Sequence, residues 1–321
     1  MLSLLGRGDI RHNLLLVVCL ATSYLAQDVS SQLVGCDVLG CQNGCHLGNV
    51  TTSFIGTTFF NTTVSPDAPL TWTVGASTQE SSSNSTELEF VKNFYLGYPS
   101  SAKIASTSEI VGCALFFEGI AKSITLNGTL EYGPVTCGQT LGDDCVNDLV
   151  SQAQRQVKSL SDPSDSNTAS VCFTLQARLE AQPPASCRST ATVTWGNVVA
   201  KEISGAGVRL DPIKQTSCHP STGGSDYDIA LVEVQTVTSE DVSSDNAPFA
   251  FSMTPVLTVF FNSSGANPGS SALPEAHLSC LKVVQDSSLT QSTTNTAASS
   301  VPRLPCLMAM SVLAMSAVAF V

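Results

Sequence analysis

The side chains best suited to catalysis in this sequence are carboxylates in or beside runs of strand-forming residues. Hydrolysis of a glycosidic bond needs only two such groups, an acid and a base or nucleophile, at roughly 5 to 9 Å from each other. The candidates are Glu118, Glu131, Asp226, Asp228 and Glu233. Because the chain has 26 acidic residues, some pair of this kind is always available, so the pattern favours a solvated acidic surface over a catalytic pair.

Other catalytic arrangements lack their signature residues. The sequence contains no G-x-S-x-G elbow, no H-E-x-x-H zinc motif and no glycine-rich phosphate loop. The segment D-Y-D-I-A-L at 226–231 is similar to the strand that carries the aspartate of chymotrypsin-type proteases, but no Cys-flanked histidine or G-D-S-G-G accompanies it. The four histidines follow no metal-binding pattern, so neither a metal nor a cofactor is expected.

A binding function would depend on aromatic side chains, whose flat faces stack on sugar rings while their polar edges form hydrogen bonds. Tyr95 and Tyr98 lie close together in F-Y-L-G-Y-P, and Trp72 lies in the preceding apolar run. Tyr98 stands between a glycine and a proline, which predicts an exposed turn. These three residues are the candidate glycan-binding residues, with the alternative that Trp72 and Trp195 are core residues of strands.

Both ends of the chain carry apolar segments that predict export. Two arginines precede residues 14–21 (L-L-L-V-V-C-L-A), the layout of a signal peptide, with cleavage expected after Ser23. Residues 304–321 are apolar and follow a spacer of small polar residues, which signals a glycosylphosphatidylinositol (GPI) anchor attached at Asn295. The alternative is a transmembrane helix of about 27 Å, although no basic residues follow the apolar run to hold it in place.

The remaining cysteines predict a disulfide-rich protein. Ten of the twelve lie outside the two terminal segments: Cys36, Cys41, Cys45, Cys113, Cys137, Cys145, Cys172, Cys187, Cys218 and Cys280. An even number in an exported chain predicts five disulfides, whose connectivity the spacing does not decide. Cys36, Cys41 and Cys45 with His46 are a metal-binding alternative, but their spacing matches no common zinc motif.

Glycosylation is predicted by five N-x-[ST] sequons, at Asn49, Asn61, Asn84, Asn127 and Asn262. Such asparagines are expected on the surface, because the glycan is bulky and hydrophilic. Residues 286–295 are rich in serine and threonine and resemble an O-glycosylated stalk. The net charge of −12 repels phosphate backbones, so a nucleic-acid partner is not expected.

Hydrophobic periodicity predicts mainly strands. The expected strands are 51–58, 70–75, 88–96, 110–117, 170–179, 190–200, 227–237, 253–261 and 276–284. Residues 123–132 predict a β-hairpin with Asn127 and Gly128 in a two-residue turn. One segment, 143–160, has apolar residues at helical spacing, acidic residues at its start and basic residues near its end, and predicts an α-helix.

Together these features predict a mainly β, disulfide-stapled, sandwich-like ectodomain with one short helix at about 143–160. The expected organisation is a signal peptide (1–23), an N-terminal β-rich half that ends in the helix (24–160), a C-terminal β-rich half (161–285), a stalk (286–295) and a removed anchor signal (296–321). The polar segment 161–169 is the candidate boundary between the halves, which are either two domains or one.

In the layout of its termini, sequons and Ser/Thr stalk, the chain resembles GPI-anchored cell-surface glycoproteins of fungal cell walls. The resemblance is to a class and transfers no functional residue. It implies a location on the outer face of the plasma membrane or in the wall, with the membrane as a partner through the lipid anchor. The expected function is a non-enzymatic structural, adhesive or glycan-binding role with wall polysaccharide as a partner, and the alternative is a carbohydrate-active hydrolase with a carboxylate pair.

Overall fold

The computed structural model describes the residues of one compact unit, within Gln32–Val321. Most of its regular structure is β-strand, which confirms the predicted fold class. The described residues are 45–47, 50–52, 54–80, 88–102, 104, 108–121, 124, 126–128, 130, 133–160, 168–188, 195–213, 227–238, 252–263 and 273–284. Both terminal segments and the stalk lie outside these ranges, as do Cys36, Cys41, Cys218, Asn49, Asn84 and Asn295.

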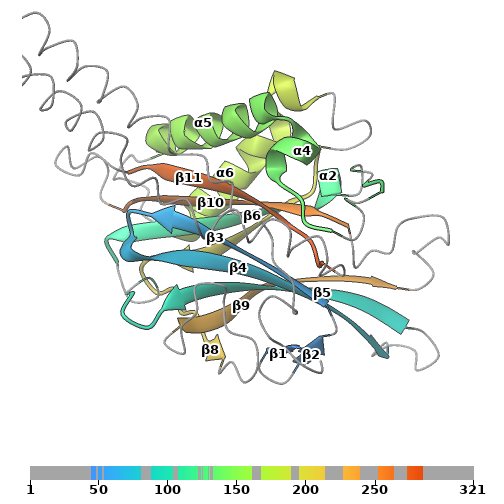
Figure 1. Ribbon diagram of the computed structural model, residues 1–321. Helices are drawn as coiled ribbons and strands as arrows, with labels where there is room; N and C mark the ends of the chain where they lie inside the picture. Colours follow the sequence, from blue (N-terminus) through green and yellow to red (C-terminus); the bar gives the residue numbers. More distant parts are fainter. Residues whose placement is uncertain are drawn as a thin grey trace, which may run out of the picture. The chain divides into compact units, whose positions relative to one another are not determined.

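Two antiparallel sheets form the body of the unit. The outer sheet has the order β3 (Phe54–Thr62), β4 (Ser65–Glu80), β5 (Leu88–Pro99), β9 (Tyr227–Thr238) and β8 (Pro212–Ile213). The central sheet has the order β11 (Glu275–Leu281), β10 (Thr254–Asn262), β6 (Ile110–Phe117) and β7 (Val198–Ser204). A small hairpin of β1 (Cys45–Leu47) and β2 (Val50–Thr52) lies against the outer sheet, on the side away from the central sheet (Figure 1).

Helices cover the other face of the central sheet and make a third layer (Figure 1). They are α2 (Glu118–Ala121), α4 (Cys137–Leu141), α5 (Asp143–Leu160), α6 (Thr168–Ala181) and the 3-10 turn η1 (Ala185–Cys187). The helix predicted at 143–160 is confirmed with both of its bounds, as α5. Its apolar stripe of Leu149, Ala153 and Val157 is buried, as the spacing requires.

The core between the two sheets is built around aromatic side chains. Trp72 on β4 and Phe94 on β5 both pack edge-on against Phe116 on β6, with ring centroids 5.7 and 5.2 Å apart. The indole Nε1 of Trp72 donates a hydrogen bond of 2.9 Å to the hydroxyl of Thr258 on β10. These contacts join the outer sheet to the central sheet at its middle strands.

The central sheet is buried on both faces, because the outer sheet covers one and the helices cover the other. Every residue of β6 from Val111 to Phe117 is buried, and so is β10 from Thr254 to Phe261. This explains why both strands read as continuous apolar runs rather than as alternating patterns.

The strand predicted at 170–179 is wrong, since this segment belongs to helix α6. Cys172, Leu175 and Leu179 are buried at helical spacing, whereas Phe173 is 57 % exposed. The helix lies beside β7, the edge strand of the central sheet. The side chains of Gln176 and Glu180, one turn apart, accept hydrogen bonds from β7 backbone N–H groups that have no strand partner on that side.

The hairpin predicted at 123–132 is also wrong for the residues that the structure describes, since none of residues 124, 126–128 and 130 is in a strand. Leu126 is buried in the core, and the carbonyl of Leu130 accepts a hydrogen bond from the Nζ of Lys282. The Leu130 carbonyl is therefore bonded to a lysine side chain and not to a neighbouring strand. The strand predicted at 190–200 overlaps β7 (Val198–Ser204) at residues 198–200 only, since 195–197 precede the strand and 190–194 lie outside the described residues.

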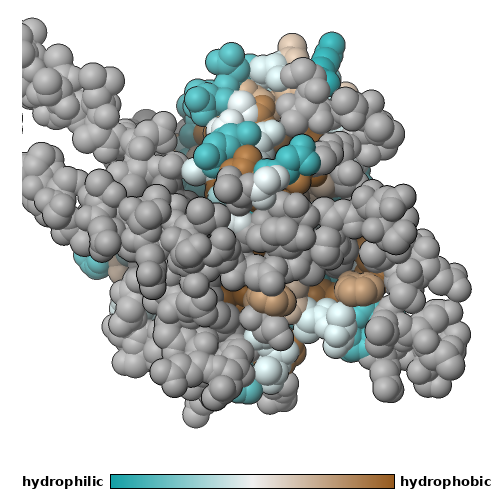
Figure 2. All heavy atoms as spheres, turned by 45° about the vertical axis from the view of Figure 1, so that its right-hand side comes forward, coloured by the Kyte–Doolittle hydropathy of each residue, from teal (hydrophilic) through white to brown (hydrophobic). Residues whose placement is uncertain are grey.

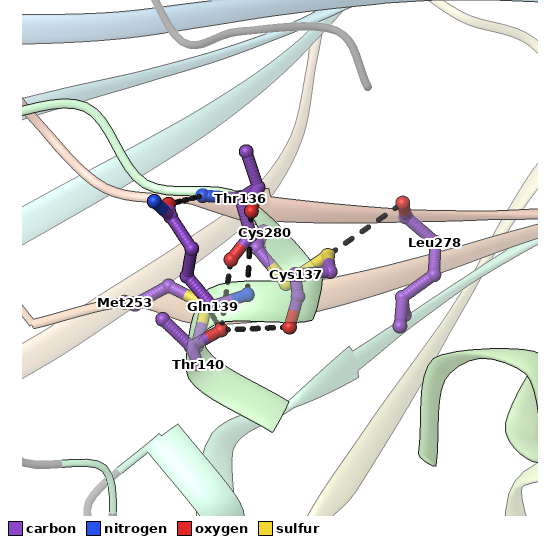
Figure 3. The surroundings of a disulfide bond; sticks show 7 residues. All are labelled: Thr136, Cys137, Gln139, Thr140, Met253, Leu278 and Cys280. Atoms are coloured by element: carbon purple, nitrogen blue, oxygen red, sulfur yellow. Dashed lines mark hydrogen bonds between the residues drawn. A yellow bond between two sulfur atoms is a disulfide. The ribbon is translucent and has the colours of Figure 1, made fainter. Parts of the chain in front are cut away.

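Disulfides attach the helical layer to the rest of the unit. Cys113 on β6 is bonded to Cys172 on α6, Cys137 on α4 to Cys280 on β11, and Cys145 on α5 to Cys187 in η1. Figure 3 shows the second of these beside a capping box, in which the Thr136 hydroxyl accepts from the Gln139 N–H while the Gln139 side chain accepts from the Thr136 N–H.

Both sheets combine strands from the two sides of the segment 161–167. In the outer sheet β9 pairs with β5, and in the central sheet β7 and β10 both pair with β6. All three described disulfides also join a residue before this segment to one after it. The two predicted halves therefore share both sheets.

Candidate functional site

The three aromatic residues predicted to bind glycans are buried. Trp72 and Tyr98 belong to the core between the sheets, and Tyr95 packs on the opposite face of the outer sheet with Leu47 and Ile55. Burial raises the pKa of the Tyr95 phenol to about 12. None of the three presents a flat face to solvent, so the predicted stacking site is corrected: these are core residues, and Tyr98 ends strand β5 instead of lying in an exposed turn.

The candidate acids are held by partners other than a second carboxylate. Glu118 accepts hydrogen bonds from the side chains of Asn197 (2.9 Å) and Gln235 (3.2 Å), and Glu233 forms an ion pair of 2.9 Å with Lys201. Asp228 lies close enough to Tyr98 to raise its pKa, after the larger effect of burial. Glu131 and Asp226 lie outside the described residues.

Three sequon asparagines are among the described residues. Asn61 and Asn127 are exposed and Asn262 is half-buried. The Asn61 sequon lies at the turn between β3 and β4, where Glu275 of the central sheet accepts hydrogen bonds from the Thr62 hydroxyl and from the N–H and hydroxyl of Thr63. This carboxylate fastens the turn of one sheet to a strand of the other.

Hydrogen bonding also decides the charge state of Glu275. Burial by itself would raise the pKa of this carboxyl, but the nearby His277 and the hydrogen bonds from Thr62 and Thr63 outweigh it, so the pKa is lowered. The Nε2 of His277 lies 3.7 Å from the carboxylate. Glu275 is therefore ionised at neutral pH, as a clamp on three backbone and hydroxyl donors requires.

Two lysines are buried at one end of the space between the sheets, and sequence reasoning missed both. The Nζ of Lys92 on β5 donates to the carbonyl (2.8 Å) and hydroxyl (2.6 Å) of Ser252, just before β10. The Nζ of Lys282 donates to the carbonyls of Leu130 and Gly133. The sequence signal for Lys92 is a lysine at an inward-facing position of an apolar strand, in the segment E-F-V-K-N-F.

Burial lowers the pKa of Lys92 to about 7; Glu118 opposes this shift, and Lys282 adds to it. The ammonium group of Lys92 thus loses its proton near neutral pH, where an ordinary lysine keeps it. Its hydrogen bonds to Ser252 connect the outer sheet to the start of β10. We assign Lys92 to structure and to the pH dependence of folding, which is taken up in the Discussion.

A pocket of about 420 Å³ opens in the helical layer, between α5 and the turn that follows α6. Its volume lies in the range of roughly 300 to 1,000 Å³ that is usual for small-molecule sites. The lining consists of three glutamines, one arginine and two prolines, with Ala185 at the start of η1: Gln152, Arg155, Gln156, Gln182, Pro183 and Pro184. Figure 2 shows that the surface at this helical end of the molecule is largely hydrophilic.

The pocket is held in shape on both sides. Gln152, Arg155 and Gln156 project from one face of α5, since they are separated by three or four residues. The opposite wall is fixed to α5 by the disulfide of Cys145 with Cys187 and by the hydrogen bond from the Gln152 side chain to the carbonyl of Gln182. Two consecutive prolines restrict the backbone of that wall further.

The polar groups of the pocket leave hydrogen-bonding capacity for a ligand. The Oε1 atom of Gln156 is buried and has no hydrogen-bond partner among the described residues. Buried polar atoms normally have a partner, and this atom lacks one in the described part of the chain. Arg155 is exposed at the rim, and no hydrogen bond or ion pair joins it to the part of the chain that the structure describes.

No family model, no curated protein and no solved structure matches the chain significantly. Across the ranges given above, no three His, Cys, Asp or Glu side chains are placed to hold a metal ion. No helix in those ranges has the length and apolar character to cross a membrane.

Proposed function

We propose that this chain is a GPI-anchored cell-surface glycoprotein without catalytic activity, with a structural, adhesive or glycan-binding role at the cell wall. The observation that supports it most is the set of three disulfides, two of which join helices to the central sheet while Cys145–Cys187 joins α5 to η1. Stable structural disulfides are typical of proteins that fold in an oxidising, exported compartment. The exposure of Asn61 and Asn127 is compatible with glycosylation at both.

The anchor is tested on intact eukaryotic cells that express the full chain. Treatment with a phosphatidylinositol-specific lipase should release the protein into the medium, and mass spectrometry should find the C-terminal peptide ending at Asn295. Digestion with an N-glycanase should lower the apparent mass. A protein that stays on the membrane after complete lipase treatment, with residues 304–321 still present, would show a transmembrane span instead of an anchor.

The binding role is supported by the pocket lined by Gln152, Arg155 and Gln156, because amide and guanidinium groups suit the hydroxyl and acidic groups of sugars. We therefore expect the full-length protein, purified in detergent, to be retained by wall polysaccharides. Turnover of one of these polysaccharides, abolished by Glu118→Gln or Glu233→Gln, would favour the hydrolase alternative. Retention without turnover favours the binding role.

A further inference from the structure

Resting on the glycan-binding form of the proposed function, we propose that the pocket between α5 and the turn after α6 binds sugars that bear a carboxylate group, such as uronic acids. Among the described residues that line the pocket, Arg155 is the one cation and none is acidic. In a protein with a net charge of −12, this is a local exception. A pocket whose sole formal charge is positive selects an anionic group.

The geometry of a guanidinium suits a two-oxygen anionic group. Its planar fork of N–H donors binds carboxylates, and phosphates too, bidentately. The carboxylate is proposed because, in a glycan-binding role, uronic acids supply the anionic group. Arg155 is available for such a pair, since no described residue occupies its guanidinium.

The rest of the lining suits a sugar ring better than a small organic acid. Side-chain amides both donate and accept, so Gln152, Gln156 and Gln182 can bond to hydroxyl groups whose hydrogens point either way. The half-buried Pro183 presents apolar surface against which the C–H face of a pyranose can pack.

The pocket is also rigid enough to bind without a large ordering cost. Asp148, one turn before Gln152 on α5, accepts a hydrogen bond of 2.7 Å from the hydroxyl of Ser186, beside the Cys145–Cys187 disulfide. This contact also engages the Asp148 carboxylate with η1. Preorganisation of this kind raises affinity because less conformational freedom is lost on binding.

The test measures binding of a trigalacturonate and of its methyl ester to the full-length protein by isothermal titration calorimetry. The two probes have the same rings and hydroxyls and differ in charge. We expect the acid to bind about tenfold or more tightly than the ester, and Arg155→Gln to lose about the same factor for the acid alone. Arg155→Lys should recover only part of the loss, because an ammonium group cannot bind bidentately.

Arg178→Gln is the matched control, because Arg178 lies on the same layer, bonds to Ser159 at 2.7 Å and does not line the pocket. It should leave the binding of the acid unchanged. The proposal would be overturned by equal binding of the acid and the ester, by an equal loss of affinity in Arg155→Gln and Arg178→Gln, or by no binding at millimolar concentration. Retention on neutral wall polysaccharides with no preference for the acid over its ester would overturn it while the proposed glycan-binding role stands.

Discussion

At the scale of single residues, the unusual groups among the described residues are buried charged side chains that join separate elements of the unit. Lys92 and Lys282 are almost completely buried, and Glu275 is 9 % exposed. Each is held by hydrogen bonds to backbone or hydroxyl groups of a neighbouring element. Removing one partner of such an interaction leaves a buried group unsatisfied, so their substitution has a measurable cost.

Because the pKa of Lys92 is low in the folded state, the stability of the protein depends on pH above neutrality. The folded-state pKa of about 7 lies below the ordinary value of 10.5, so between these values the unfolded chain binds more protons than the folded one. The free energy of unfolding should therefore rise with pH from about 7 to about 10.5, and below pH 7 the penalty for burying the charge is present in full.

Lys92→Met removes this titration. We expect the stability of the wild type relative to Lys92→Met to increase by a few kcal/mol between pH 7 and pH 10.5, as measured by urea unfolding. Lys201→Met, which removes a partly exposed lysine, is the control and should show a much smaller pH dependence. A stability difference that is flat over this range would mean that Lys92 keeps its proton in the folded state.

Glu275→Gln should destabilise the protein by about 1 to 3 kcal/mol at pH 7, because the amide cannot accept from the donors of Thr62 and Thr63 as a carboxylate does. The pKa of Glu275 is lowered in the folded state, so its contribution is present above the pKa of an unfolded glutamate and is lost as the pH falls through the folded value.

Thermal unfolding of the wild type and of Glu275→Gln at several pH values between 7 and 3 tests this expectation. The stabilities of the two proteins should converge at the acidic end. Glu89→Gln, on the outer sheet away from this clamp, serves as the comparison and should change stability by less than about 0.5 kcal/mol. A constant difference at all pH values would assign the effect to packing instead of charge.

At the scale of elements, the helical layer decides how the central sheet is closed. α6 lies along the edge strand β7, where Gln176 and Glu180 bond to its backbone, and Cys172 is bonded to β6. An uncovered edge strand is prone to pair with other chains. The helix thus protects the edge as well as burying the apolar face.

The helical assignment of α6 is testable because a strand and a helix bury different residues. In a strand Phe173 and Leu175 would share one buried face, whereas in α6 only Leu175 is buried. We expect Phe173→Ser to change the free energy of unfolding by less than about 0.5 kcal/mol and Leu175→Ala to lower it by about 2 to 5 kcal/mol. Denaturant unfolding of both variants gives the answer, and comparable losses in the two would contradict the helix.

At the scale of the whole molecule, the described unit is a three-layer structure whose sheets interleave strands from both halves of the chain. Pairing of β5 with β9 and of β6 with β7 and β10 means that neither half can complete a sheet alone. The three disulfides cross the same segment. Folding of this unit therefore requires residues that are far apart in the sequence.

Cutting the chain within 161–167 tests this arrangement. With a protease site inserted there, we expect the cleaved protein to keep its far-ultraviolet circular dichroism and to run as one species on a non-reducing gel and as two fragments on a reducing gel. The reason is that Cys113–Cys172, Cys137–Cys280 and Cys145–Cys187 each connect the two fragments. Separation into two fragments without reductant would indicate two independently bonded domains.

Local patterns were sufficient for many elements. The bounds of α5 follow from its amphipathic stripe, and β6, β9 and β10 follow from dense runs of Val, Ile and Phe between turn residues. The segment of α6 was ambiguous, because Val171, Leu175 and Leu179 satisfy both the strand and the helix period over this length. Only the position beside β7, with side chains that bond to its edge, resolves the ambiguity.

By itself, the sequence determined the mainly β class, the main helix and a cysteine count that implies disulfides, because these depend on residue type and local period. The tertiary structure decided which cysteines pair, that Trp72 and Tyr95 are core residues, and that Gln156 and Arg155 of α5 meet the prolines after α6 in one pocket. These features depend on contacts between distant segments, and burial cannot be read from a residue without knowing what covers it.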